Sequence, residues 1–373
     1  VPLVSLGINP DNSAGKGLEA AARRLRYAAI EGQVADGAGL LTAHHADDQA
    51  ETLLLNLMRG SGVDGLAAMP DSRPFGKGLL QRPLLEFQGS ALRNYLRTHN
   101  VEWVEDPSNQ HTGHDRNFVR HEVIPLLETH WPEVSKRLLL TRRAMSGARY
   151  LLEGLADAYL ALHLAHPQVL QITPQARTDP ELFKLIVRRW LKTTGVPSMP
   201  VYRLESLLTQ VCQAHAGHQV SIEWGDCVLH CYRQQLWLLP NGELPACQVR
   251  EWPADDNCAD LGDDIGQLAF TSRLPDRWAK GLTISNRTQF SEAAIEHGGH
   301  HKSLKKIFQA SGIPTWLRDC IPLCKLDGEL VAIGDWFFSD RFTELMSTHQ
   351  THLKWRPRNP LLQYLLARQH TDG

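Results

Sequence analysis

One stretch of sequence decides the fold of the first part of the chain: Leu40-Leu41-Thr42-Ala43-His44-His45-Ala46-Asp47-Asp48-Gln49-Ala50-Glu51-Thr52. Its apolar start follows two glycines and predicts a short, buried parallel strand over Leu40–Ala43. Its acidic second half runs into leucines and predicts a helix over Asp47–Met58. A strand that leads into a helix in this way is typical of a parallel α/β sheet, in which ligands bind beyond the C-terminal strand ends.

The rest of the first 150 residues continues this alternation. Strand-like runs lie at Val1–Ile8 and Val101–Val104, and helix-like segments lie at Leu18–Ala29 and Leu84–His99. We therefore expect an α/β fold with a doubly wound parallel sheet over residues 1–150.

The remaining sequence predicts helices first and strands later. Helical spacing covers 133–163 and 180–215, and the pattern turns to β over Val220–Leu239. We expect four further parts: a mostly helical domain with a β-hairpin at 151–245, an acidic linker at 246–267, a small α+β domain at 268–356 that contains a basic helix at Ser303–Ala310, and a tail at 357–373. The linker is predicted because Glu251–Asp264 holds six acids and no base.

Composition and charge limit the classes of protein. The 373 residues carry 39 Lys and Arg against 41 Asp and Glu, a net charge of −2, and 42% hydrophobic residues, which indicates an ordinary globular protein. No run approaches the roughly 18 apolar residues of a membrane span, and the N-terminus lacks the features of a signal peptide. All seven cysteines lie at position 212 or later, and an odd number without a signal sequence predicts reduced, buried thiols. We expect a cytoplasmic protein without a membrane partner.

The densest polar cluster is part of the opening stretch: His44, His45, Asp47, Asp48 and Glu51. Carboxylates in the first turn of a helix are stabilised by the helix dipole by about 0.3–1 kcal/mol each, so an acidic helix cap is one interpretation. The crowded carboxylates repel one another, so the cluster also favours binding of a cation, which would offset this repulsion. From spacing alone, a metal ion and a substrate ammonium group are equally good candidates.

Three other segments carry polar groups at suggestive spacing. Asp106 and Asn109 lie in a turn-rich loop, and Arg116 and Arg120, four residues apart, either begin a helix with ion pairs or face one anion such as a phosphate. Basic residues also recur without acids over 135–150 and again over 300–306. These two runs are either solvated helix faces or contacts to a nucleic-acid backbone: Lys136, Arg137, Arg142, Arg143 and Arg149, and Lys302, Lys305 and Lys306.

Taken in order, these motifs resemble those of the bacterial tRNA(Ile)-lysidine synthetases of the N-type ATP pyrophosphatase superfamily. The family signature His-x-x-Asp-Asp-Gln-x-Glu-Thr is complete when His44 is aligned and one residue short when His45 is. Further matches follow in family order over nearly the whole chain: Arg59-Gly60-Ser61-Gly62, Arg82-Pro83-Leu84-Leu85, Asp106-Pro107-Ser108-Asn109, Arg116-Asn117, Arg120, Leu304-Lys305-Lys306, Gly312-Ile313-Pro314, Trp316-Leu317-Arg318-Asp319 and Pro322-Leu323.

The resemblance also implies a segment that this sequence does not contain. The family begins with a strand and a Ser-Gly-Gly-x-Asp-Ser loop whose amides hold the pyrophosphate of ATP, and no such stretch occurs here. Val1-Pro2-Leu3-Val4 resembles the third strand of the family. We therefore expect an N-terminally truncated domain that lacks roughly 60–70 residues, judged from the usual size of βαβ units.

The activity implied by the resemblance has two steps. ATP, with Mg²⁺, adenylates the C2 carbonyl oxygen of the wobble cytidine in the CAU anticodon of tRNA(Ile), and the amine of L-lysine then attacks C2 and expels AMP. The lysine ammonium groups would be held by Asp48 and Glu51, with Asp106 beside them. His45 and Asp47 would lie near ATP or its Mg²⁺, and Arg116, Arg120 and Asn109 would face the phosphate.

The tRNA would be held outside this centre by basic side chains of the run Lys136–Arg149 and of the last domain. The expected contacts are Lys136, Arg137, Arg142, Arg143, Lys302, Lys305, Lys306 and Arg318. Whether the protein forms a homodimer is left open.

Three alternatives compete with this interpretation. A tRNA thiolase of the same superfamily would need paired cysteines near the centre, and none precedes Cys212. A non-catalytic tRNA-binding remnant would follow from loss of the nucleotide loop. A metallohydrolase would use His44, His45, Asp47 and Asp48 as metal ligands.

Overall fold

A computed structural model of the chain describes residues 3–8, 18–104, 115–213, 220–241, 244–253, 256–273, 275–289 and 294–371. The chain divides into two compact units, residues 1–155 and 156–373. Among the described residues, no helix is both long enough and apolar enough to cross a membrane.

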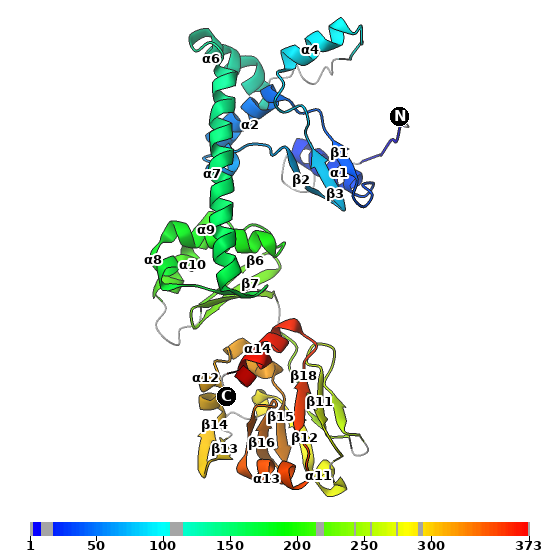
Figure 1. Cartoon of the computed structure of the whole chain (residues 1–373), viewed down its shortest axis with the longest axis vertical. Coiled ribbons are helices and arrows are strands. Elements are labelled where there is room, and N and C mark those ends of the chain that lie inside the picture. Colours follow the sequence, from blue (N-terminus) through cyan, green and yellow to red (C-terminus); the bar gives the residue numbers. More distant parts are fainter. Residues whose placement is uncertain are drawn as a thin grey trace. The chain divides into compact units, whose positions relative to one another are not determined.

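The first unit combines helices with a small sheet (Figure 1). Its strands are β1 (Gly39–Leu41), β2 (Ser72–Phe75) and β3 (Gly78–Gln81). Its helices are α1 (Leu18–Glu31), α2 (Ala46–Met58), α3 (Val63–Leu66), α4 (Gly89–Thr98), α5 (Asp115–Phe118), the π-helical turn η3 (Val119–Val123), α6 (Ile124–His130) and α7 (Val134–His163), which extends past the division at residue 155.

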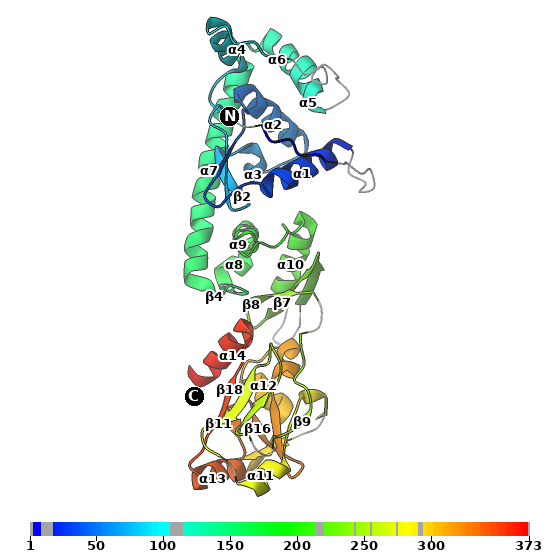
Figure 2. The ribbon, with the colours of Figure 1, turned by 90° about the vertical axis from the view of Figure 1, so that its right-hand side faces the viewer.

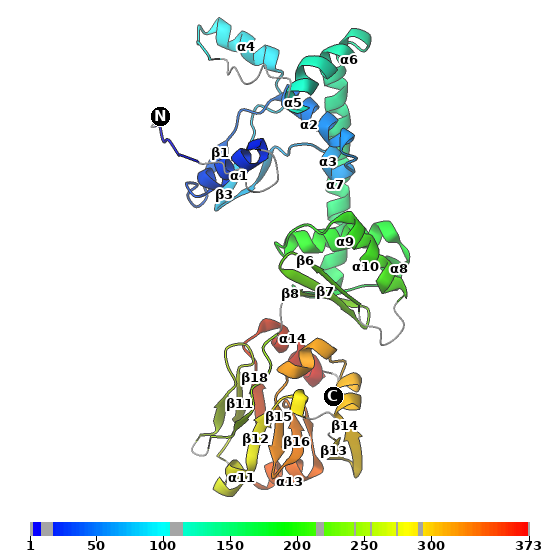
Figure 3. The ribbon, with the colours of Figure 1, turned by 180° about the vertical axis from the view of Figure 1, so that it is seen from behind.

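The sheet has the order β1-β3-β2, and its strands β2 and β3 were not among those predicted from the sequence. Strand β1 runs parallel to β3 with Leu40 opposite Leu80, and β2 and β3 form an antiparallel hairpin. Helix α1 lies against this sheet, where the ring of Tyr27 meets that of Phe75 edge to face at 5.9 Å (Figure 3). The α/β fold class is therefore confirmed, and the strand that leads into α2 is the one that the sequence predicts.

Several details of the first unit differ from the sequence prediction. The strand at β1 was expected to be buried, but it lies at the edge of the sheet and Leu41 is exposed. The described part of the first run, Leu3–Ile8, and the run Val101–Val104 are not strands, because neither pairs with a described neighbour. The helix expected from Leu84 begins only at Gly89.

The second unit begins with helices packed on an antiparallel sheet (Figure 2). The strands have the order β4-β5-β8-β7-β6 and the helices α8, α9 and α10 cover one face. Their bounds are β4 (Leu164–His166), β5 (Val169–Gln171), α8 (Pro174–Thr178), α9 (Pro180–Thr193), α10 (Val201–Gln213), β6 (Val220–Trp224), β7 (Cys227–Tyr232) and β8 (Gln235–Pro240). The predicted hairpin is thus part of a larger sheet, closed over a core that includes Phe183, Trp190 and Leu204.

The last part of the chain is a second α+β core. Its strands form a five-stranded sheet (β17-β16-β15-β12-β9), a three-stranded sheet (β10-β11-β18) and the hairpin β13-β14. The strands are β9 (Arg250–Glu251), β10 (Cys258–Asp260), β11 (Gln267–Phe270), β12 (Leu282–Ser285), β13 (Ala294–His297), β14 (His300–Ser303), β15 (Leu323–Leu326), β16 (Glu329–Ile333), β17 (Phe337–Phe338) and β18 (Leu353–Arg356). The helices are α11 (Asp276–Gly281), η4 (Arg287–Gln289), α12 (Leu304–Ala310), η5 (Thr315–Cys320), α13 (Asp340–Thr348) and α14 (Pro360–Thr371).

Two segments outside this predicted domain belong to its structure. The acidic segment contributes strands β9 and β10, and Asp260 pairs with Arg358, so this segment is not merely a linker. The expected tail forms helix α14, whose Leu361 and Leu365 are buried in the same core as Phe308. The basic helix predicted at Ser303–Ala310 is present as α12.

Candidate active site

The first turn of α2 is an acidic helix start. His45 is the residue before the helix, with an extended backbone (φ −127°), and its backbone N–H donates a 2.9 Å hydrogen bond to Asp48 Oδ2. This bond satisfies one of the amides that a helix leaves unpaired at its N-terminus. The acidic cap expected from the sequence is therefore present, but it uses only one oxygen of Asp48.

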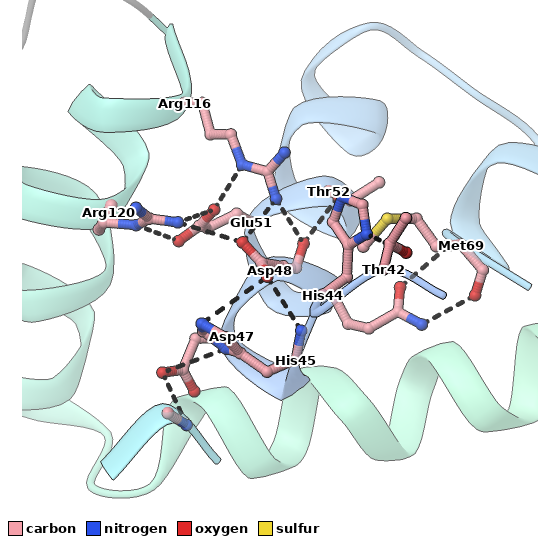
Figure 4. A network of polar contacts seen from close by, with 12 residues as sticks. Thr42, His44, His45, Asp47, Asp48, Glu51, Thr52, Met69, Arg116 and Arg120 are labelled. Atoms are coloured by element: carbon pink, nitrogen blue, oxygen red, sulfur yellow. Dashed lines mark hydrogen bonds and ion pairs between the residues drawn. The ribbon is translucent and has the colours of Figure 1, made fainter. Parts of the chain in front are cut away.

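The remaining carboxylate oxygens of Asp48 and Glu51 accept hydrogen bonds from two arginines that lie far away in the sequence (Figure 4). Arg116 Nε donates to Glu51 Oε2 at 2.7 Å, and its Nη2 donates to Asp48 Oδ1 at 2.9 Å. Arg120 Nε donates to Glu51 Oε1 at 2.6 Å, and its Nη2 donates to Glu51 Oε2 at 3.0 Å and to Asp48 Oδ1 at 3.2 Å. Each guanidinium thus bridges both carboxylates.

This four-residue cluster of Asp48, Glu51, Arg116 and Arg120 is electrically balanced. Glu51 is only 1% exposed, and a buried carboxylate is stable only when it is paired and hydrogen-bonded. The hydrogen bond from Arg120 to Glu51 raises the pKa of that guanidinium. The cluster therefore ties α2 to α5 and η3 through charge-assisted hydrogen bonds.

Each guanidinium group keeps one terminal nitrogen outside these hydrogen bonds. Among the hydrogen bonds of the described residues, neither Arg116 Nη1 nor Arg120 Nη1 takes part, and about 30% of both side chains is exposed (28% and 32%). A guanidinium that is fixed on one side by carboxylates presents its remaining N–H groups in a defined direction. The pair can therefore receive an anion from solvent while it holds Asp48 and Glu51.

Asp47 is the accessible carboxylate of the group. Its side chain is 39% exposed, its Oδ2 accepts a 3.3 Å hydrogen bond from the backbone N–H of Gly89, and it lies 3.8 Å from His45 Nδ1. Gly89 is the first residue of α4, and a Cβ at this position would lie 2.7 Å from Asp47 Oδ2. The close approach of α4 to α2 therefore depends on a glycine that lies outside every motif of the sequence.

His44 lies at the strand end, on the other side of the cap from Asp47. Its Nδ1 is 2.9 Å from Thr42 Oγ1, and burial lowers the pKa of the imidazole below its usual value. Of the two histidines, His44 completes the signature spacing, whereas His45 caps the helix. Both flank the carboxylates of α2, so the structure brings together all the residues expected from the opening stretch.

Two candidate residues lie outside the described residues: Asp106 and Asn109. For a metal, no group of three or more His, Cys, Asp or Glu side chains within the described part of the chain has a suitable arrangement. Asp48, a ligand in the metallohydrolase alternative, is instead engaged by Arg116 and Arg120.

The basic residues expected to contact RNA fall into two groups. Arg137, Lys302, Lys305 and Lys306 are exposed, as are Lys136 and Arg143, which form ion pairs with Glu133 and Glu86. Arg142 is different, because it is buried and pairs with Asp71 and Glu86 at 3.4 Å each.

Arg318 is also buried, and its guanidinium group is held by neighbouring residues. Only 5% of the residue is exposed, its Nε donates to the Ile313 carbonyl at 3.2 Å, and its guanidinium lies 5.6 Å from the ring centre of Phe308. Burial lowers the pKa of this group. Arg142 and Arg318 therefore stabilise the fold, and their contact with tRNA stays a prediction.

Comparison with known proteins gives the class of the first unit and of the regions that follow. A family model described as a PP-loop domain matches residues 2–127. Models described as the TilS substrate binding domain and the TilS substrate C-terminal domain match residues 170–237 and 282–355. The first unit thus belongs to the PP-loop class, the N-type ATP pyrophosphatases.

Relatives that match over most of the chain identify the family. A tRNA(Ile)-lysidine synthase of Alkalilimnicola ehrlichii is 39% identical over 92% of this chain and 78% of its own length. Proteins with the same name from Methylococcus capsulatus and Xanthomonas campestris are 35% and 33% identical, over 91% and 93% of this chain and 80% of their own lengths. The chain belongs to the tRNA(Ile)-lysidine synthase family, as the ordered motifs predict.

Proposed function

We propose that this chain is a ligase that joins L-lysine to C2 of the wobble cytidine in the CAU anticodon of tRNA(Ile), with ATP converted to AMP and pyrophosphate. Membership of the family supports the reaction as a whole. The observation that carries the assignment of the site is the balanced cluster of Asp48, Glu51, Arg116 and Arg120 at the N-terminus of α2.

The arginines of the cluster suit an anion. Adenylation of the cytidine produces a phosphate beside the reacting carbon, and fixed N–H donors stabilise negative charge as it develops. Arg116 and Arg120 each have an Nη1 outside the hydrogen bonds of the described residues, so before lysine binds one phosphate can be held without loss of their bonds to Glu51. Asn109 stays a proposed phosphate contact on the resemblance alone.

The carboxylates of the cluster suit the cationic substrate. Glu51 is saturated by the two guanidinium groups, so a lysine ammonium group reaches it only by replacing one of them. This exchange leaves the net charge of the cluster unchanged and avoids an unpaired buried charge. In this proposal the displaced guanidinium turns to the adenylate phosphate, and Asp48 and Glu51 hold the lysine. Asp106, which lies outside the described residues, stays a proposed lysine contact on the resemblance alone.

Asp47 suits the metal ion that accompanies ATP. Mg²⁺ in nucleotide sites is usually bound by one or two carboxylates together with phosphate oxygens and water. The exposed carboxylate of Asp47 offers such an oxygen, with His45 beside it. When bound, the ion would neutralise phosphate charge.

The exposed basic residues suit the tRNA backbone. Lys302, Lys305 and Lys306 surround the start of α12, and Lys136, Arg137 and Arg143 lie on α7. Contacts of this kind position a nucleic acid and weaken with salt. The proposal includes a cytoplasmic location, and a homodimer stays a prediction without further support.

The test combines the full chain with ATP, radiolabelled L-lysine and a tRNA(Ile) transcript that carries the CAU anticodon. The expected products are labelled tRNA, AMP and pyrophosphate. Asp48→Asn should abolish lysine transfer, because it removes a carboxylate charge from the cluster, and should leave tRNA binding nearly intact. Asp64→Asn, on an exposed acid of α3, is the matched control and should be fully active.

Other outcomes would contradict the proposal. A wild-type chain that binds tRNA but forms neither AMP nor lysidine would favour the non-catalytic tRNA-binding alternative. AMP formation without lysine transfer would favour another tRNA-modifying ATP pyrophosphatase. If Asp48→Asn lost tRNA binding as strongly as lysine transfer, the assignment of Asp48 to the lysine site would be refuted.

A further inference from the structure

Two neighbouring arginines of α7 converge on one acid of the first unit. Arg142 Nη1 donates to Glu86 Oε1 at 3.4 Å, and Arg143 Nη2 donates to Glu86 Oε2. The two arginines lie 56 and 57 positions away from Glu86 in the sequence. Glu86 therefore joins helix α7 to the loop between β3 and α4.

The residues that follow Glu86 bind the first turn of α2. The backbone N–H of Ala46 donates a 2.9 Å hydrogen bond to the carbonyl oxygen of Phe87. The backbone N–H of Gly89 donates to Asp47 Oδ2 at 3.3 Å. The acid that is bound by α7 and the amide that holds Asp47 are therefore close together on one short loop.

The pairing of Glu86 holds it more firmly than an isolated surface ion pair would. The side chain of Arg142 is only 7% exposed, and a buried guanidinium group is stable only when it is paired. Its other partner, Asp71, is mostly exposed and also lies 3.4 Å away. Glu86 accepts hydrogen bonds from two guanidinium groups at once, so its carboxylate is restrained from two sides. The loop that carries Phe87 and Gly89 is thereby fixed to α7.

We propose that Glu86 is a positioning residue for adenylation, which holds the carboxylate of Asp47 in place through the Phe87 carbonyl and the Gly89 amide. The inference rests on the proposed function, which assigns Asp47 to the metal ion that accompanies ATP. The Asp47 side chain is 39% exposed and accepts a single, long hydrogen bond among the described residues, so its direction depends on where Gly89 lies. Glu86 acts on the reaction only through this loop.

A purely structural role of Glu86 would leave a different signature. If Glu86 only fastened α7 to the first unit, its removal would loosen the unit as a whole. A positioning role confines the effect to residues 86–89 and the first turn of α2, because Leu85 and the interior of α2 are buried independently of Glu86. Removal of Glu86 also releases Arg143, an exposed residue that is proposed to contact the tRNA, so tRNA affinity should not fall.

Hydrogen exchange measured by mass spectrometry on the full chain tests the positioning without any substrate. Glu86→Gln keeps the shape of the side chain but removes its charge, so exchange of the Gly89 and Ala46 amides should become about 3- to 10-fold faster. Exchange in the interior of α2 should stay at the wild-type rate. Glu102→Gln is the matched control, because it neutralises an exposed acid outside this loop and should change neither rate.

Pyrophosphate release from ATP with the tRNA(Ile) transcript, in the absence of lysine, measures adenylation. Glu86→Gln should slow this step by about 10-fold, because a misplaced group at the reacting centre is costly, and should raise the Mg²⁺ concentration needed for half-maximal rate. The Kd for tRNA and the KM for lysine should stay close to wild type.

Three results would overturn the proposal: unchanged exchange at Gly89 and Ala46, equally faster exchange throughout the first unit, or unchanged adenylation in Glu86→Gln. If the wild-type chain releases no pyrophosphate, the proposed function fails instead. The exchange experiment needs no activity and still decides whether Glu86 positions the loop, so the two failures are distinguishable.

Discussion

Arg120 Nε lies 2.6 Å from Glu51 Oε1, although the two residues are 69 positions apart in the sequence. The same carboxylate also receives Arg116 Nε at 2.7 Å, so one buried glutamate fixes two guanidinium groups. The segment 115–123 is thereby held against the N-terminus of α2. Glu51 consequently stabilises the fold as well as shaping the site.

This double role predicts a loss of stability on neutralisation. Glu51→Gln keeps the shape of the side chain but leaves two guanidinium groups without their strongest partner, so the free energy of unfolding should fall by roughly 1–3 kcal/mol. Urea denaturation measures this change in the free energy of unfolding. Asp64→Asn, which neutralises an exposed acid, should change it little. Equal effects of the two substitutions would show that the pairing with arginine contributes nothing.

Gly89→Ala should disturb Asp47 rather than the fold. The new Cβ would lie 2.7 Å from Asp47 Oδ2 and 3.2 Å from His45 Cε1, so the side chains must move. We expect lysine transfer to fall by about 10- to 100-fold, because small misplacements of reacting groups are costly. Thermal unfolding and tRNA affinity should change little. Gly147→Ala, where a Cβ meets nothing within 4 Å, is the control, and an active Gly89→Ala would remove Asp47 from the site.

The lysines at the start of α12 should control the salt dependence of tRNA binding. Lys305→Ala together with Lys306→Ala removes two exposed charges, so affinity should drop and the slope of log K against log salt should become shallower by roughly 1–2. The double variant Lys354→Ala and Arg356→Ala removes two exposed charges from β18 and is the control. An equal effect of both pairs would mean that only overall charge matters.

The cysteines should differ sharply in reactivity. Burial raises the pKa of Cys231 to about 11 and those of Cys247 and Cys320 to about 12, and it also raises the pKa of Cys324. A thiol reacts as its thiolate, so these four should resist a thiol reagent at pH 8 in the native chain. The exposed Cys212 should react first. Mass spectrometry of the labelled chain checks the order, and rapid native labelling of Cys324 would contradict it.

Acid should destabilise the chain from slightly below neutral pH. Burial lowers the pKa of His44, His166 and His230, so below the unfolded value of 6.5 the unfolded state takes up protons that the folded state resists. Stability is therefore full above pH 6.5 and is lost as pH falls through the folded pKa values. Urea unfolding at pH 7.5 and 5.5 measures the loss. His230→Gln should reduce it, and a rise in stability over this range would refute the argument.

Local patterns predicted much of the fold. The sequence correctly predicted strand β1, helix α2 and helix α12. In each of them the signals, namely apolar spacing and charged residues, lie within a few positions of one another in the sequence. Helix α14 was missed, although Leu361, Leu362, Leu365 and Leu366 have the spacing of a buried helix face.

The sequence predicted which residues form the candidate site better than it predicted how they are arranged. The signature stretch indicated the residues of α2, and their gathering at its N-terminus is confirmed. The pairing of Glu51 with Arg116 and Arg120 could not be predicted, because it joins segments whose approach depends on tertiary packing. The same reason explains Arg142, which occurs in a run of basic residues but is buried against Asp71 and Glu86.

The π-helical turn η3, from Val119 to Val123, lies between α5 and α6 and contains Arg120. Such a turn accommodates one residue more than the regular helix around it. Deleting one residue there would restore ordinary winding and rotate α5 by about 100° relative to α6. Arg116 would then point away from Glu51 even though every side chain needed for the pair was still encoded. A transfer of the segment 115–123 into another scaffold must therefore preserve its number of residues as well as their identities.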